Sequence, residues 1–124
     1  MMEDAGAGFL ESIEQLRSIC LVLPEATEQE TWGEPTFRVR GKIFALFQSD
    51  EGRPAVWCKS QPELQEAMVG SDPNRFFVPR YLGHKGWVGT RLNGDVDWVD
   101  VAGLVDESYR MIAPKRLVAQ LANG

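Results

Sequence analysis

The chain has 124 residues, of which 44% are hydrophobic and 25% are charged, and its net charge is −5 at pH 7. This length and composition are typical of one globular domain and exclude a disordered or membrane-spanning chain. Residues 1–124 are therefore predicted to form a single domain. The acidic residues 3 and 4 and the short apolar run at residues 19–23 do not form a secretion signal, which predicts a cytoplasmic protein with no membrane partner.

The middle of the chain is basic although the whole chain is acidic. Between residues 36 and 92, nine Lys or Arg outnumber five Asp or Glu by four. Such a segment forms either solvated strand faces or a surface for an anionic partner. The two cysteines, Cys20 and Cys58, lie far apart and the chain has one histidine. We therefore expect buried thiols, no metal site and no cofactor.

The first elements are predicted from periodicity. Apolar residues at spacings of three and four predict an amphipathic helix from Phe9 to Leu23, which Pro24 ends. Residues 27–32 alternate weakly and predict a charged edge strand.

A β-hairpin is predicted over residues 31–47, with a turn at Arg40-Gly41. In its first strand Phe37 alternates with Arg38, which gives one buried and one solvated face, whereas residues 43–47 are apolar on both faces and predict a central strand. Residues 55–59 predict a third strand, so that the three form an antiparallel meander.

The second half is predicted to alternate short elements. The pattern Ser60-Gln61-Pro62-Glu63 resembles a capping box before a short helix that ends near Gly70. A brief strand within residues 75–82, a strand at 86–92, and helices at 98–112 and 115–121 follow, with Asp97 as an N-cap. The fold class is an α+β two-layer sandwich, in which N- and C-terminal helices pack on one face of an antiparallel sheet.

Two groups of residues carry possible chemistry. In residues 83–87, His84, Lys85 and Trp87 offer a titrating group, a cation and a stacking plane in an exposed loop; alternatively, Trp87 fills the far edge of the sheet. No nucleophile or carboxylate neighbours His84, so no catalytic residue is predicted. Strand cations near three tryptophans form either a phosphate-binding surface or solvated faces over a core that includes Trp57; these cations are Arg38, Arg40, Lys42, Lys59 and Arg91.

The acidic run at residues 25–30 leaves two alternatives open. Carboxylates at alternate strand positions share a face and could bind a hard cation, or they form a solvated edge. The sequence contains no GxGxxG, GxxxxGK[ST], GxSxG or HExxH motif, so the common nucleotide, hydrolase and metalloprotease signatures are absent.

Several blocks of the sequence occur together in a known family. They are Leu23-Pro24-Glu25-Ala26-Thr27-Glu28, Trp32-Gly33-Glu34-Pro35-Thr36-Phe37-Arg38-Val39, Lys42-Ile43-Phe44-Ala45, Tyr81-Leu82-Gly83-His84-Lys85-Gly86-Trp87-Val88 with Arg91-Leu92, and Ser108-Tyr109-Arg110-Met111-Ile112-Ala113-Pro114-Lys115 with Trp98. In these blocks the chain resembles the MmcQ/YjbR-like family of small bacterial proteins. The resemblance implies a CyaY-like fold, similar to frataxin-type and type III secretion chaperone folds, and a "double wing" DNA-binding label, and it brings no catalytic residues.

The expected function is a non-catalytic module that binds nucleic acid. Its expected contact residues are Arg38, Arg40, Lys42, His84, Lys85, Trp87 and Arg91. The alternative is a chaperone-like module that binds another protein or a small ligand, and we expect a monomer or weak dimer. An enzyme would need a pocket that joins His84 to a carboxylate such as Glu28 or Glu34.

Overall fold

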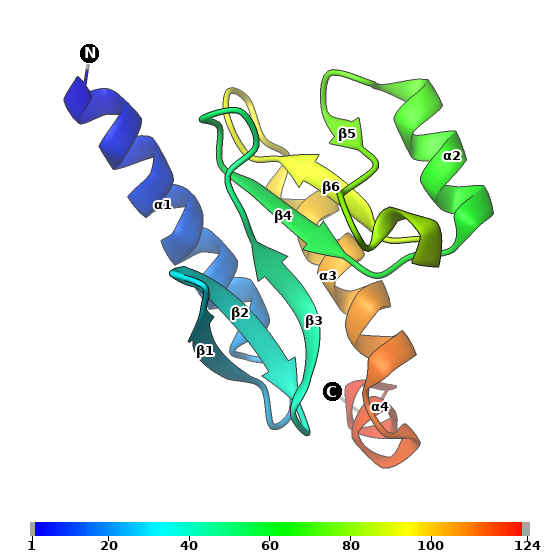
Figure 1. Ribbon diagram of the computed structural model, residues 1–124. Helices are drawn as coiled ribbons and strands as arrows, with labels where there is room; N and C mark the ends of the chain where they lie inside the picture. The colour runs from blue at the N-terminus through cyan, green and yellow to red at the C-terminus, as the bar shows by residue number, and fades with distance from the viewer. Residues whose placement is uncertain (1, 123–124) are drawn as a thin grey trace.

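Six strands form one antiparallel sheet in the order β1-β2-β3-β4-β6-β5 (Figure 1). The computed structural model describes residues 2–122, with side chains for residues 8–121. The strands are β1 (Thr27–Thr31), β2 (Glu34–Val39), β3 (Lys42–Phe47), β4 (Ala55–Cys58), β5 (Phe76–Phe77) and β6 (Val88–Arg91). The helices are α1 (Met2–Cys20), α2 (Pro62–Ser71), the 3-10 helix η1 (Gly83–Lys85), α3 (Trp98–Ile112) and α4 (Lys115–Ala122).

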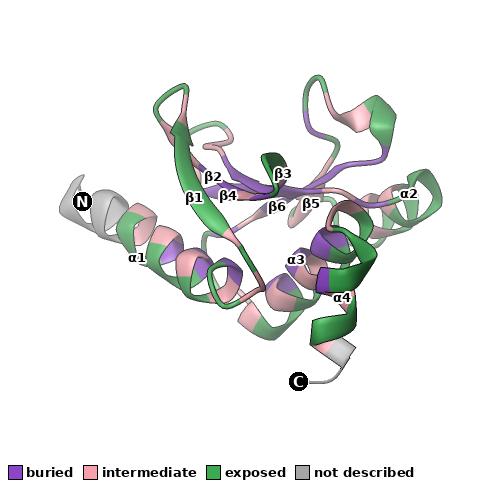
Figure 2. Ribbon diagram, turned by 90° about the horizontal axis from the view of Figure 1, so that it is seen from below, coloured by how far each residue is buried: buried purple, intermediate pink, exposed green. Residues whose placement is uncertain are grey.

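Helices α1 and α3 lie on one side of the sheet, and α4 follows α3 on that side (Figure 2). The main core lies between these layers, where Leu16 of α1, Phe37 of β2 and Tyr109 of α3 are fully buried. The Tyr109 hydroxyl donates a hydrogen bond of 2.6 Å to the carbonyl of Pro24, which fixes α3 to the link between α1 and β1. The predicted α+β two-layer architecture is confirmed.

The predicted hairpin and meander are confirmed, and β3 lies inside the sheet. The hairpin turns at Arg40-Gly41, where φ is +52° and +81°. A two-residue turn with both φ values positive is a type I′ turn, whose twist matches that of the flanking strands. Trp32-Gly33 (+52° and +83°) and Glu51-Gly52 (+51° and +80°) have the same geometry, so three X-Gly pairs set the connections of the meander.

One prediction in the second half was wrong. Ser60 does not cap α2, because the N-cap residue is Gln61 and it makes no side-chain capping bond. Pro62 explains this, since proline favours the first turn of a helix and an extended residue before it. The brief strand predicted within residues 75–82 is confirmed and consists of Phe76–Phe77, and residues 83–85 form a 3-10 turn. Among the described residues, no helix is long and apolar enough to cross a bilayer.

Candidate functional site

The sheet face opposite α1 and α3, called the outer face below, carries a second apolar cluster. Thr36, Leu46, Trp57, Gly89 and Phe77 follow one another across β2, β3, β4, β6 and β5 in the strand register. Leu46 and Trp57 pack together with Trp87, and both tryptophans are only 6% exposed. The floor of the outer face is therefore apolar and well packed, and polar groups lie toward its margins.

Arg38 is a fixed cation on the outer face. Its Nε donates to Thr36 Oγ1 (3.3 Å), its Nη1 to the carbonyl of Gly41 (3.2 Å) and its Nη2 to Thr31 Oγ1 (3.0 Å). All three acceptors are neutral, and Arg38 has no ion pair within the part of the chain whose side chains are described. The guanidinium is thus held in one orientation while its charge is not neutralised.

Arg40 lies two residues further along and differs from Arg38 in this respect. Its Nε and Nη2 donate to the two carboxylate oxygens of Glu25, at 2.6 and 3.0 Å. These hydrogen bonds hold the pKa of the Glu25 carboxyl below its usual range. Arg40 therefore carries a compensated charge and fastens the β2–β3 turn to the loop before β1.

Arg91 is also engaged inside the molecule. Its Nε donates to Asp50 Oδ2 (2.8 Å) and its Nη1 to the carbonyls of Pro73 (3.0 Å) and Asn74 (3.1 Å). The guanidinium lies 4.7 Å from the ring centroid of Phe77, in a cation–π arrangement. Arg91 was predicted to contact nucleic acid, but its side chain already has four partners within the molecule.

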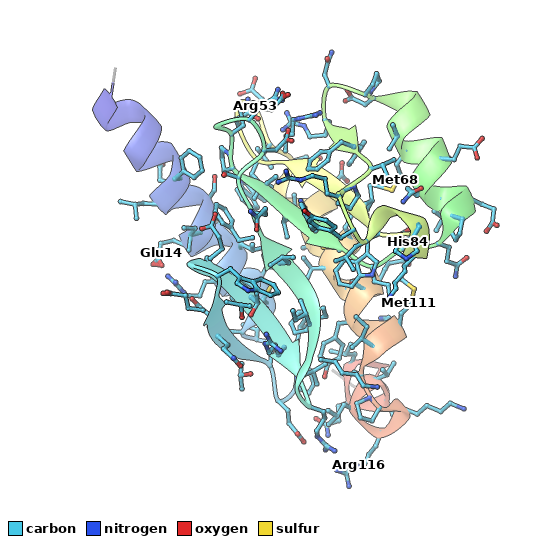
Figure 3. The ribbon with its side chains drawn as sticks, in the orientation of Figure 1. Glu14, Arg53, Met68, His84, Met111 and Arg116 are labelled. Carbon is cyan, nitrogen blue, oxygen red and sulfur yellow. The ribbon has the colours of Figure 1, made fainter. Side chains whose placement is uncertain are left out.

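The remaining predicted residues lie at two separate places. Lys42 is exposed beside the β2–β3 turn, and His84 and Lys85 are exposed on η1, at the end of the molecule that carries α2 (Figure 3). Trp87 is buried against Leu46 of β3 and Trp57 of β4, so it offers no stacking plane. The alternative was right that Trp87 packs on the sheet, but its partners lie on interior strands and not at the far edge. The structure does not gather the seven predicted residues into one cationic surface.

The acidic run at residues 25–30 is partly neutralised. Arg17 of α1 donates to both carboxylate oxygens of Glu28 (2.6 and 2.8 Å), and it also bonds Glu14. Glu28 lies opposite the buried Phe37 in the register, so it faces the helical layer. Among the side chains of residues 8–121, no three of His, Cys, Asp or Glu group as metal ligands would. The ion pair of Glu28 with Arg17 therefore links the edge strand β1 to α1.

Two exposed aromatics stand out on the outer side. Trp32 is 89% exposed with φ +52°, and Tyr81 is 82% exposed with φ +67°. The β1–β2 turn, which contains Trp32, and the segment from β5 to η1, which contains Tyr81, both rise from the sheet away from α1 and α3 (Figures 1 and 2). The sequence left open whether Trp32 is buried or exposed, although Trp-Gly between two strands signals a turn. Tyr81 was not predicted as a site residue.

A crevice lies between α1 and two loops, the one that joins β3 to β4 and the one that follows β6. Its volume is about 870 Å³. Phe9, Leu92, Val96 and Trp98 provide apolar walls, and Gln15 and Asn93 provide amide groups. This size falls within the range of small-molecule sites.

These features define a small two-layer α+β protein whose sheet leaves one face uncovered by the long helices. The family model described as YjbR matches residues 21–111, so the chain belongs to the YjbR family. It is 29% identical over 101 residues to the uncharacterized protein YjbR of Escherichia coli K12, covering 80% of this chain and 85% of that protein, and its counterpart in strain O157:H7 gives the same values.

Two solved structures share the fold. The Deinococcus radiodurans protein DR2400, described as a DUF419 domain, superposes with a TM-score of 0.71 at 24% identity, covering 81% of this chain and 77% of that one. A Bacillus subtilis protein of the DUF1801 family gives a TM-score of 0.53 at 18% identity, covering 79% and 74%. At these identities the similarity concerns the fold alone.

Proposed function

We propose that the chain is a non-catalytic module that binds nucleic acid on the outer face of its sheet. The observation that supports this most is Arg38, a cation oriented by three neutral acceptors. Phosphate contacts depend on such available guanidinium groups, whereas an arginine already paired with a carboxylate contributes little. Lys42, Lys85 and His84 add exposed basic groups at two margins.

The distribution of acidic residues is consistent with this proposal. Helices of the opposite layer carry many of the carboxylates, including Glu11 and Glu14 on α1 and Asp100 and Glu107 on α3. A net charge of −5 disfavours binding through the whole surface and favours binding through one face. The slope of binding affinity against salt concentration should then correspond to a small number of phosphate contacts.

The test is a titration with fluorescent oligonucleotides, single-stranded and duplex, at about 50 and about 200 mM salt. The Arg38→Gln variant removes the available charge, and we expect weaker binding and a salt slope smaller by about one. The matched control is Glu25→Gln/Arg40→Gln, which removes the compensated pair between the hairpin turn and the loop before β1 without changing net charge, and its affinity should equal that of the wild type. Absence of binding at the lower salt, or equal affinity for Arg38→Gln, contradicts the proposal.

A second candidate function is small-ligand binding in the crevice beside α1, which its volume of about 870 Å³ and its apolar walls favour. The probe 1-anilinonaphthalene-8-sulfonate tests whether the crevice is accessible in the native protein. The Gln15→Trp variant fills the crevice from the exposed side of α1 and should abolish an increase in probe fluorescence. Equal fluorescence in both proteins contradicts a site at this position.

A further inference from the structure

Among residues 2–122, five residues other than glycine have positive φ, a conformation that L-amino acids with large side chains rarely adopt. They are Glu25, Trp32, Arg40, Glu51 and Tyr81. Such positions persist when the surrounding structure or the function makes use of them. The contacts of each of these five side chains therefore indicate why the residue occupies a strained position.

Three of these five side chains are used inside the molecule. Glu25 and Arg40 pair with each other at 2.6 Å, and Glu51 pairs with Arg53 at 3.0 Å. The other two are Trp32 and Tyr81, which make no side-chain hydrogen bond to any described residue and are 89% and 82% exposed. Asparagine would suit the first position of the Trp32-Gly33 turn far better. An exposed indole at a strained turn thus has no internal reason and points to a contact with another molecule.

The position of Trp32 next to Arg38 indicates the chemistry of that contact. Arg38 Nη2 donates to Oγ1 of Thr31, the residue directly before Trp32. An oriented cation and an exposed aromatic plane therefore occur together at one end of the outer face. A nucleotide presents the same two features, a phosphate and a base, next to each other along a strand.

We propose that the outer face takes single-stranded rather than duplex nucleic acid, with Arg38 at a phosphate and Trp32 stacked on the adjacent base. This inference rests on the proposed function and names its substrate class. The faces of paired bases are covered within a duplex, so an indole stacks only on an unpaired base. Tyr81, on the segment that rises at the other margin, is the second stacking residue.

The experiment compares the wild type with Trp32→Asn and Trp32→Phe, using an oligothymidylate of about ten nucleotides and a mixed-sequence duplex. Asparagine favours the turn, so Trp32→Asn stays folded while it removes the aromatic plane. We expect it to lose about tenfold or more in affinity for the single strand and to leave the duplex affinity unchanged, whereas Trp32→Phe retains most of the affinity. The Glu51→Asn variant changes a turn of the same geometry away from Arg38 and should bind as the wild type does.

Iodide quenching of tryptophan fluorescence provides a direct readout, because Trp32 is far more exposed than the buried Trp57 and Trp87. Bound oligothymidylate should protect part of the wild-type tryptophan fluorescence from iodide. The Trp32→Asn variant should show no such protection.

The outcomes separate this inference from the function on which it rests. If the wild type binds nucleic acid but Trp32→Asn binds the single strand equally well, the stacking inference is overturned and the proposed function stands. If the wild type binds neither oligonucleotide, both are overturned. Protection of Trp32 that increases with protein concentration in the absence of oligonucleotide would assign this surface to a second copy of the chain and overturn the inference.

Discussion

The ring of Phe77 lies directly over Gly89, its register partner on β6, and a Cβ atom on that glycine would overlap three ring carbons. The guanidinium of Arg91 lies over the same ring, 4.7 Å from the ring centroid. Gly89 therefore allows the two-residue strand β5 to close the edge of the sheet. We expect Gly89→Ala to lower the free energy of unfolding by about 1–3 kcal/mol, because the ring must shift out of place. Urea denaturation measures this change.

The control for Gly89→Ala is Gly103→Ala, on α3, where an added Cβ atom meets nothing within 4 Å. Alanine favours a helix, so this variant should be more stable by up to about 1 kcal/mol. In a Phe77→Ala background the cost of Gly89→Ala should largely disappear, since the overlapping ring is gone. Equal losses in both backgrounds would show that the ring is not the cause.

A second prediction concerns the stability at low pH. Hydrogen bonds from Arg17 hold the pKa of the Glu28 carboxyl below its usual value of 4.5. Because the folded pKa is lower than the unfolded one, this carboxylate stabilises the fold above about pH 4.5 and loses its contribution as the pH falls through the folded pKa. The side chain is 25% exposed, so the contribution is at most about 1 kcal/mol.

The measurement is the free energy of unfolding of the wild type and Glu28→Gln from about pH 7 to about pH 2. The variant should be less stable at neutral pH and should lose less stability as the pH falls, so that the two curves converge. Glu63→Gln, on α2, alters a carboxylate without an ion pair among the described side chains and should parallel the wild type. Curves of wild type and Glu28→Gln that stay parallel would refute the argument.

A third prediction concerns the two thiols, which are free and buried. Burial raises the pKa of the Cys58 thiol to about 12 and that of Cys20 well above its usual range. Since the thiolate is the reactive form, Ellman's reagent at pH 8 should modify neither thiol in the native protein and both after unfolding. Ser71→Cys places a thiol on the exposed end of α2 and should react at once. Immediate reaction of the wild type would contradict the buried positions.

The hairpin and the meander could be predicted because local signals and the global fold agree, whereas the position of β6 between β4 and β5 was not predicted. Arg40-Gly41 sets a turn, Phe37 marks the buried face of β2, and Asp97 caps α3 through bonds to the amides of Val99 and Asp100. Each of these signals acts within a few residues of the chain. The capping box at Ser60 failed because Pro62 competes for the same helix start.

The candidate site could be predicted only in part, because its properties depend on contacts between distant residues. Arg38 and Arg40 have the same residue type and similar neighbours in the sequence, yet among the side chains of residues 8–121 only Arg40 meets a carboxylate, that of Glu25. Arg91 is engaged by Asp50, which is 41 residues away. Charge and alternation place arginines on a strand, but ion pairing depends on the tertiary structure and decides which of them remains available to a ligand.

A final prediction concerns the stability of the exposed turn. The indole at Trp32 has φ +52°, where a large side chain is strained and asparagine is favoured. We therefore expect Trp32→Asn to raise the free energy of unfolding by about 1 kcal/mol, measured by urea denaturation with an unchanged m-value. Glu51→Asn, at the same position of another type I′ turn, should gain less, because it loses the ion pair of Glu51 with Arg53. A loss of stability in Trp32→Asn would mean that the indole packs against the sheet and that the turn is not strained by it.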